Sequence, residues 1–197
     1  MEPYDALSEP DGYAASPWFR SGYPQGAQMN ERMLSLAGAE LSSILPGDVP
    51  AAYRAIAEEG WTVDGNGAYL LSALQAGHHG YTAGEFEDFV HFEATVNGRG
   101  MMDYDLPASG PERQNRLLRR SIAYACLALQ AAPEESEHPL LGYVSLSEGG
   151  LSDDTLTANV TFCTRRPGIP PYISSIQDYS EESLLELSRD DALRALK

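Results

Sequence analysis

Apolar residues spaced three or four positions apart predict helices in four parts of the chain. These parts are residues 30–45, residues 48–60, residues 109–131, and a C-terminal helix or pair of helices with Ser180 and Ser188 as caps. The third is the most regular, because Ser109-Gly110-Pro111-Glu112 has the form of a capping box with proline in the first turn. Its apolar stripe, which we expect to face the core, consists of Leu118, Ile122, Ala125, Cys126 and Leu129.

Alternating apolar and polar residues predict two β-hairpins. One joins residues 140–148 to residues 156–164. The other lies in FVHFEATVNGRGMMDYDL, residues 89–106, where Asn97-Gly98 is a strong hairpin signal. A three-residue loop of Asn97, Gly98 and Arg99 gives this hairpin one apolar face, so we prefer that register. Trp61–Val63 is a further candidate strand, followed by a short buried helix over residues 68–76.

This order of elements predicts an α+β fold, with an antiparallel sheet built from two β-hairpins and helices packed on one face. We expect residues 29–197 to form a single α+β domain. Residues 1–28 are rich in Pro, Gly, Ser and Ala and predict an irregular or disordered N-terminal arm. Three aromatic residues of that arm are candidates for binding a partner: Trp18, Phe19 and Tyr23. The predicted element order resembles that of the acidic secretion chaperones, which implies a role in escorting a protein partner.

The charge of the chain excludes several kinds of partner. Its 29 acidic and 13 basic residues give a net charge of -16, which argues against direct binding of nucleic acid or of anionic membranes. The only lysine is Lys197, so no lysine inside the fold can form a Schiff base or contact a phosphate in a nucleotide-binding loop. No signal peptide or membrane span is predicted, so we expect a soluble cytoplasmic protein.

Four polar residues of the first predicted hairpin form a candidate metal or acid/base site. In the preferred register Glu93 lies opposite Asp103, and His91 lies opposite Asp105. Opposed carboxylates repel one another, and a divalent cation or a shared proton would offset that cost. His78 and His79 lie just upstream and would add ligands for manganese, magnesium or zinc. The alternative is that all of these side chains face water, where repulsion is screened.

Two further groups of residues bear on chemistry. The long helix carries four arginines, which form either a charged outer face or a site that binds carboxylates or phosphate: Arg113, Arg116, Arg119 and Arg120. The only cysteines, Cys126 and Cys163, are expected to be packed thiols, and their disulfide state is left open.

Three functions remain open at this point. The favoured one is a small acidic bacterial protein-binding domain, immunity- or chaperone-like, that neutralises or escorts a basic protein partner and needs no cofactor. The second is a metal-assisted hydrolase or other enzyme that uses His91, Glu93, Asp103 and Asp105. The third is an acidic mimic of nucleic acid. The first is preferred because the chain carries no HExxH, CxxC or GxSxG motif and no glycine-rich nucleotide loop.

Overall fold

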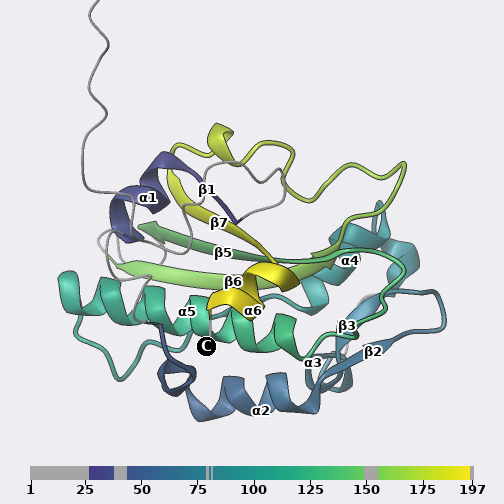
Figure 1. Ribbon diagram of the computed structural model, residues 1–197, viewed down its shortest axis with the longest axis horizontal. Coiled ribbons are helices and arrows are strands. Elements are labelled where there is room, and N and C mark those ends of the chain that lie inside the picture. Colours follow the sequence, from purple (N-terminus) through teal and green to yellow (C-terminus); the bar gives the residue numbers. More distant parts are fainter. Residues whose placement is uncertain (1–26, 38–43, 79, 81, 149–154, 196–197) are drawn as a thin grey trace, which may run out of the picture.

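The computed structural model of the chain describes residues 27–37, 44–78, 80, 82–148 and 155–195. Within these residues the fold is α+β, with six helices, a five-stranded antiparallel sheet and a two-stranded sheet (Figure 1). The predicted fold class is therefore confirmed. Trp18, Phe19 and Tyr23 lie outside the described residues. Gln28 and Met29 form a short strand, so the chain joins the sheet slightly before the expected boundary of the arm.

The helices are α1 (Glu31–Ala37), α2 (Ala51–Glu59), α3 (Ser72–Ala76), α4 (Phe89–Val96), α5 (Pro111–Gln130) and α6 (Arg189–Ala195). The strands are β1 (Gln28–Met29), β2 (Trp61–Val63), β3 (Tyr69–Leu71), β4 (Arg99–Gly100), β5 (Leu140–Glu148), β6 (Leu156–Thr164) and β7 (Glu182–Ser188). The five-stranded sheet has the order β1-β7-β5-β6-β4, and β2 pairs with β3 separately. Short 3₁₀ turns occupy Pro46–Asp48, Ala83–Glu85 and Ile176–Asp178.

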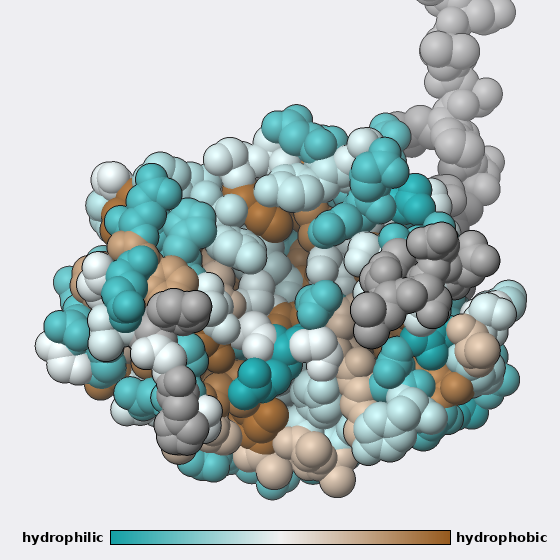
Figure 2. Space-filling model, turned by 180° about the vertical axis from the view of Figure 1, so that it is seen from behind, coloured by the Kyte–Doolittle hydropathy of each residue, from teal (hydrophilic) through white to brown (hydrophobic). Residues whose placement is uncertain are grey.

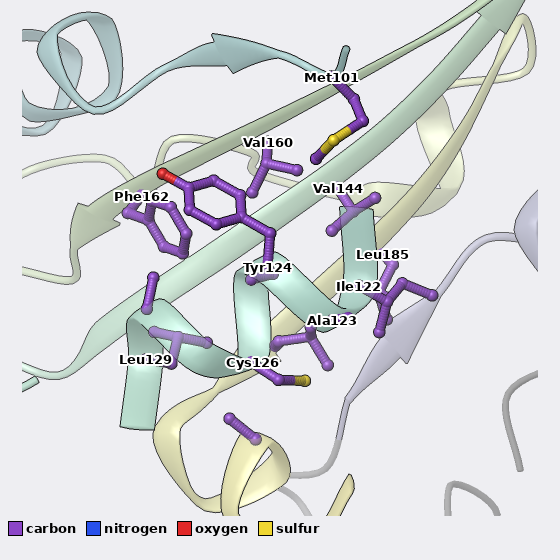
Figure 3. Close-up of a cluster of buried hydrophobic side chains, with 14 of the residues drawn as sticks. Met101, Ile122, Ala123, Tyr124, Cys126, Leu129, Val144, Val160, Phe162 and Leu185 are labelled. Atoms are coloured by element: carbon purple, nitrogen blue, oxygen red, sulfur yellow. The ribbon is translucent and has the colours of Figure 1, made fainter. Parts of the chain in front are cut away.

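The main core lies between α5 and one face of the five-stranded sheet. The predicted stripe of α5 is buried throughout, and it packs against apolar residues of β5, β6 and β7. Figure 3 shows the ring of Tyr124 beside Phe162 and Val160, and the two rings meet edge to face with centroids 5.8 Å apart. Because α5 buries one whole side of a long helix, this layer determines how the rest of the sheet is placed.

The second predicted hairpin is confirmed. β5 and β6 pair over nine positions, with Val144 opposite Val160 and Ser145 opposite Asn159. Their alternation directs Val144 and Val160 into the core, and leaves Ser145 and Asn159 on the other face of the sheet.

The first predicted hairpin is wrong, because residues 89–96 form α4 and the strand after the turn is only Arg99–Gly100. The Asp88 side chain caps the helix by accepting a hydrogen bond from the backbone N–H of His91. The buried residues of α4 include Glu93, which hydrogen-bonds to β3 and β6. Alternating apolar residues suggested a strand, but the segment is capped by Asp88 and buries Val90, Phe92, Ala94 and Val96 as a helix.

The prediction of a helix from Ser180 is also wrong, because residues 182–188 form β7. This strand lies between β1 and β5, so both of its edges are paired. Leu185 and Leu187 reach the same core as α5. The prediction that Ser188 caps the last helix is confirmed, since its hydroxyl accepts a hydrogen bond from the backbone N–H of Asp191. Similarly, residues 68–76 are not one helix: β3 comes first and α3 follows.

The face of the sheet opposite α5 is only partly covered. α4 packs against β6 there, and Val90 and Ala94 join a small apolar cluster with Leu141, Tyr143 and Cys163. Ile169, Tyr172 and Ile173, from the segment between β6 and β7, complete that cluster. No described helix covers the rest of this face, and a groove lies over it.

Candidate binding groove

The groove runs over the uncovered part of the sheet and has a volume of about 590 Å³. Its floor comes from β5, β6 and β7, and its sides come from α4 and from the segment between β6 and β7. Figure 2 shows the molecule from behind: its middle is hollowed and carries pale side chains of intermediate hydropathy, with strongly hydrophilic residues on both sides. The volume lies within the range of ordinary ligand sites.

Small polar side chains form the floor. The strand register aligns Leu184, Ser145 and Asn159 in one row, with Tyr143 and Thr161 in the next. The hydroxyl of Thr161 donates to the backbone oxygen of Ala94, so it helps to hold α4 against β6. Ser145 and Asn159 have no such bond among the described residues, which leaves a hydroxyl and an amide available to a ligand.

Close approach of α4 to β4 shapes one end of the groove. A Cβ atom on Gly98 would lie 2.9 Å from the backbone oxygen of Ala94, so this position requires glycine. Gly100, opposite Asn159, has no side chain to cover the floor.

Four ring-bearing side chains line the groove: His91, Tyr143, Tyr172 and Tyr179. The ring of Tyr172 packs against Tyr143 with centroids 5.3 Å apart, and the ring of His91 lies 6.0 Å from Tyr172. Tyr179, further along the same segment, is 41% exposed. Aromatic rings of this kind offer an apolar face and a polar tip to the same ligand.

Glu182 is the one acidic side chain among the described residues that line the groove. Among the described residues, no hydrogen bond or ion pair engages the carboxylate of Glu182. Arg99 is the only described lysine or arginine among the lining residues, but it pairs with Val160, whose side chain is in the core. Because directly opposed residues share a face, the guanidinium of Arg99 points away from the groove, toward Tyr53 and Tyr124. Burial raises the pKa of both phenols, and the charge of Arg99 offsets only part of that rise.

The pKa of the Tyr172 phenol is raised above its ordinary value. Burial is the main cause, and the neighbouring Cys163, Tyr179 and Glu182 add to it. Tyr179 and Glu182 are therefore near enough to the Tyr172 hydroxyl to influence it. Tyr172, Tyr179 and Glu182 all line the groove, and the Asn30 side chain holds the backbone of Tyr179 and Glu182 together.

His91 is the one residue of the predicted metal or acid/base site that lines the groove. Its Nδ1 lies 3.0 Å from Oδ1 of Asp88. Burial would raise the pKa of Asp88, but hydrogen bonds from the backbone and ring of His91 bring it below its ordinary value. The aspartate therefore fixes the orientation of the imidazole.

Glu93 lies away from the groove, on the fully buried side of α4 that faces β3 and β6. Its carboxylate accepts from the backbone N–H groups of Tyr69 (2.9 Å) and Thr164 (2.7 Å), from the Thr164 hydroxyl (2.6 Å) and from Arg166 (2.6 Å). These four bonds account for the acceptor capacity of the carboxylate, so the structure gives Glu93 a structural part.

Asp103 and Asp105 do not face His91 and Glu93, so the predicted pairing across a hairpin is wrong. Asp103 accepts a hydrogen bond from Arg113, and Asp105 binds Arg120 through two hydrogen bonds of 2.8 and 2.5 Å. The hydrogen bonds from Arg120 hold the pKa of Asp105 down at about 2. Repulsion between the acids is thus avoided by pairing each with a cation from the next helix, α5.

The four arginines of α5 all bind acidic side chains of their own chain. Arg116 pairs with Glu112 one turn earlier, and Arg119 pairs with Asp48. Arg113 is buried, and it also donates to the backbone oxygens of Leu156 and Pro107. The structure thus places all four in contacts within the fold. Arg113, Arg119 and Arg120 fasten the loops before α2 and α5, and Arg116 pairs within α5 itself.

Within the described residues, no group of three or more His, Cys, Asp or Glu side chains is placed to hold a metal ion. His78 lies after α3, with its ring 6.5 Å from Phe92, and His79 lies outside the described residues. Cys126 and Cys163 are free and buried, and burial raises both thiol pKa values, that of Cys126 to about 12. The sequence prediction that both are packed thiols is confirmed.

Sequence reasoning missed most of the groove. The alternation of β5 and β6 did indicate which residues lie opposite the core, including Asn159 and Thr161. It did not indicate that this face stays uncovered, and Tyr172, Tyr179 and Glu182 lie in a stretch for which no strand was predicted. A row of small polar side chains on a strand, without a predicted covering helix, was the available signal.

None of the described helices is both long enough and apolar enough to cross a lipid bilayer. Comparison of the chain with protein-family models, curated proteins and solved structures finds no match.

Proposed function

We propose that the protein is a binding protein that holds a short basic segment of a partner polypeptide in this groove. The observation that carries the proposal is the Glu182 carboxylate, which lines a tyrosine-rich groove without an ion pair among the described residues. A cytoplasmic setting in a bacterium is part of the proposal.

The composition of the groove supports protein binding. Tyrosine, serine, glycine and asparagine are the residues that antibody binding sites favour, because tyrosine gives rigid contact area and the small residues give adaptable hydrogen bonds. The groove offers Tyr172 and Tyr179 beside Ser145, Asn159 and Gly100. Such a surface suits an extended peptide, whose backbone groups need hydrogen-bond partners.

The charge of the whole chain favours a basic partner. At a net charge of -16, the protein attracts cationic segments over a distance and repels acidic ones. Most described arginines are already paired within the fold, including all four of α5. The excess of carboxylates is therefore left to face solvent or a partner.

The experiment is an NMR titration of the full chain. The probes are blocked heptapeptides of serine and threonine with one central arginine, and the same peptides with a central glutamate. We expect amide shifts at Ser145, Asn159 and Thr161 with the basic peptide only, and weaker binding as salt is raised. Ser145→Trp, which fills the groove, should abolish the shifts, while Thr95→Trp, on the exposed side of α4, should not.

Three results would overturn the proposal. One is the absence of shifts at millimolar peptide. Another is shifts of equal size for the basic and acidic peptides. The third is shifts confined to residues outside the groove.

The hydrolase alternative keeps one observation in its favour, the Asp88–His91 pair at the edge of the groove. An imidazole held by a carboxylate is suited to general acid/base catalysis when a reacting group lies within hydrogen-bond reach. A screen with ester and phosphoester substrates tests it, and activity that is lost in His91→Ala but kept in His138→Ala would favour the enzyme.

A further inference from the structure

We propose that the end of the groove bounded by Tyr172, Tyr179 and Glu182 is a subsite for one cationic side chain, a guanidinium or an ammonium group. This inference rests on the proposed function and deepens it, since it says which part of a basic segment is recognised and by what. The subsite is rigid, it carries a carboxylate without a described ion-pair partner, and its rings suit a cation.

Asn30 makes the subsite rigid. Its side-chain amide donates to the backbone oxygens of Tyr179 (2.9 Å) and Glu182 (2.7 Å), and its oxygen accepts from the backbone N–H of Leu184 (3.1 Å). Asn30 is 2% exposed, so solvent does not compete for these bonds. The turn that carries Tyr179 and Glu182 is thus fastened to β1 and β7 without the help of a ligand, and a preorganised site loses less entropy on binding.

Glu182 supplies the unpaired charge. It is the first residue of β7 and is partly buried beside the tyrosines, and no described cation pairs with its carboxylate. Glu186 lies four residues further along β7 and on the same face, and it has Arg165 as its ion-pair partner at 3.3 Å. A partly desolvated carboxylate is stabilised when a cation reaches it, so Glu182 is the point on this strand where a ligand's cation gains most.

The rings suit a cation because of how they are packed. One neighbour of Tyr172 is Tyr143, tilted at 59°, and Tyr179 is exposed at the mouth of the groove. A guanidinium or ammonium group is attracted to the face of a phenol ring, and more strongly where water is partly excluded. The fold already contains one such contact elsewhere, with Arg166 4.9 Å from the centre of the Phe89 ring.

Nearby charges favour a cation and disfavour an anion. Asp178 and Glu181 are exposed on either side of Tyr179, and both add negative potential at the mouth of the groove. Arg99 is the only described arginine among the lining residues, and its side chain lies on the other face of the sheet. A carboxylate or phosphate group would therefore find no described guanidinium to bind here.

The test compares heptapeptides that differ only at the central residue: arginine, lysine, citrulline or norleucine. Citrulline has nearly the shape of arginine but no charge. We expect arginine and lysine peptides to bind about tenfold more tightly than the citrulline and norleucine peptides, as measured by NMR titration of the full chain.

Variants of the protein locate the preference. Glu182→Gln should remove the advantage of arginine over citrulline, whereas Glu58→Gln, at an exposed position on α2 outside the groove lining, should keep it. Tyr179→Phe should also keep it, because the ring face remains, and Tyr179→Leu should lower it. The dispersion of the amide spectrum shows that each variant is folded.

The outcomes separate this inference from the proposed function. If no peptide binds in the groove, the proposed function fails, and the subsite with it. If all four peptides bind there equally, or if Glu182→Gln leaves the arginine preference unchanged, the groove binds peptides but the cation subsite is wrong.

Discussion

Glu93 and Arg166 form an ion pair with N and O atoms 2.6 Å apart in the interior, where their side chains are 0% and 10% exposed. The same guanidinium donates to the backbone oxygen of Gly67 and to the hydroxyl of Thr164. The pair therefore joins α4, the end of β6 and the turn between β2 and β3. It holds α4 in the position that forms one side of the groove.

Removing the carboxylate of this pair should be costly. We expect Glu93→Ala to lower the free energy of unfolding by about 3–5 kcal/mol, because Arg166 stays buried without its partner and two backbone N–H groups lose their acceptor. Urea unfolding at pH 7 measures the change. Glu87→Ala, an exposed position just before α4, is the control and should change it by less than about 0.5 kcal/mol. Equal effects of the two substitutions would contradict the structural part given to Glu93.

The side chain of Asn97, one turn after Glu93, hydrogen-bonds to buried backbone groups of β3 and β6. Its oxygen accepts from the backbone N–H of Leu71, and its amide donates to the backbone oxygens of Tyr69 and Phe162. We expect Asn97→Ala to lower the free energy of unfolding by about 2–3 kcal/mol, since three buried backbone groups lose a partner.

The same urea experiment tests this, with Asn66→Ala as its control, because Asn66 is exposed in the turn between β2 and β3. Faster amide hydrogen exchange at Leu71 in the Asn97 variant would identify the bond that was lost. Unchanged exchange at that amide would show that another group satisfies it.

The Asp105–Arg120 pair gives a defined dependence of stability on pH. The pKa of Asp105 is held at about 2 in the folded protein, mainly by its hydrogen bonds to Arg120, whereas an unfolded aspartate titrates near 3.9. A depressed pKa contributes stability that is present above the unfolded value and is lost as the pH falls toward the folded one. The stability difference between the native protein and Asp105→Asn should therefore be greatest above about pH 4 and vanish toward pH 2.

Thermal unfolding between pH 7 and pH 2 measures this difference. Glu135→Gln, an exposed position in the loop after α5, serves as the comparison and should follow the native profile. A difference for Asp105→Asn that stays constant down to pH 2 would mean that the pair does not act through this titration.

The two cysteines should not react with thiol reagents while the protein is folded. Both are buried and free, and a thiol whose pKa is raised by burial has little thiolate at neutral pH. We expect no labelling by a thiol-specific chromophore at pH 8 in native buffer, and two labelled cysteines per chain in 6 M guanidinium. Rapid labelling of Cys126 in native buffer would be inconsistent with its buried position on α5.

The sequence could predict those elements whose own residues favour a helix over a strand, or a strand over a helix. α5 has a proline in its first turn and an uninterrupted apolar stripe, and β5 and β6 have matching alternation. The residues of β7 do not favour one structure over the other, because Leu184, Leu185 and Leu187 suit a helix as well as a strand. The decision comes from β1 and β5, which lie on either side of it, and β5 begins more than forty positions earlier in the chain.

The candidate site was predictable to a smaller extent for the same reason. His91 was identified from its chemistry, but its expected neighbours were drawn from a hairpin that is a helix. Its real neighbours, Asp88 and Tyr172, come from the start of α4 and from the segment before β7. Asp103 and Asp105 could have been matched to Arg113 and Arg120 by charge alone, since these arginines follow within fifteen positions.

The place of β7 in the middle of the sheet has a consequence for biosynthesis. Because synthesis proceeds from the N-terminus, β1 and β5 leave the ribosome well before the strand that pairs with both. Until β7 emerges, each presents an open edge to other chains, which is the usual starting point of misassembly. Translational pausing before residue 182 would therefore be the moment at which a nascent chain of this protein most needs a chaperone.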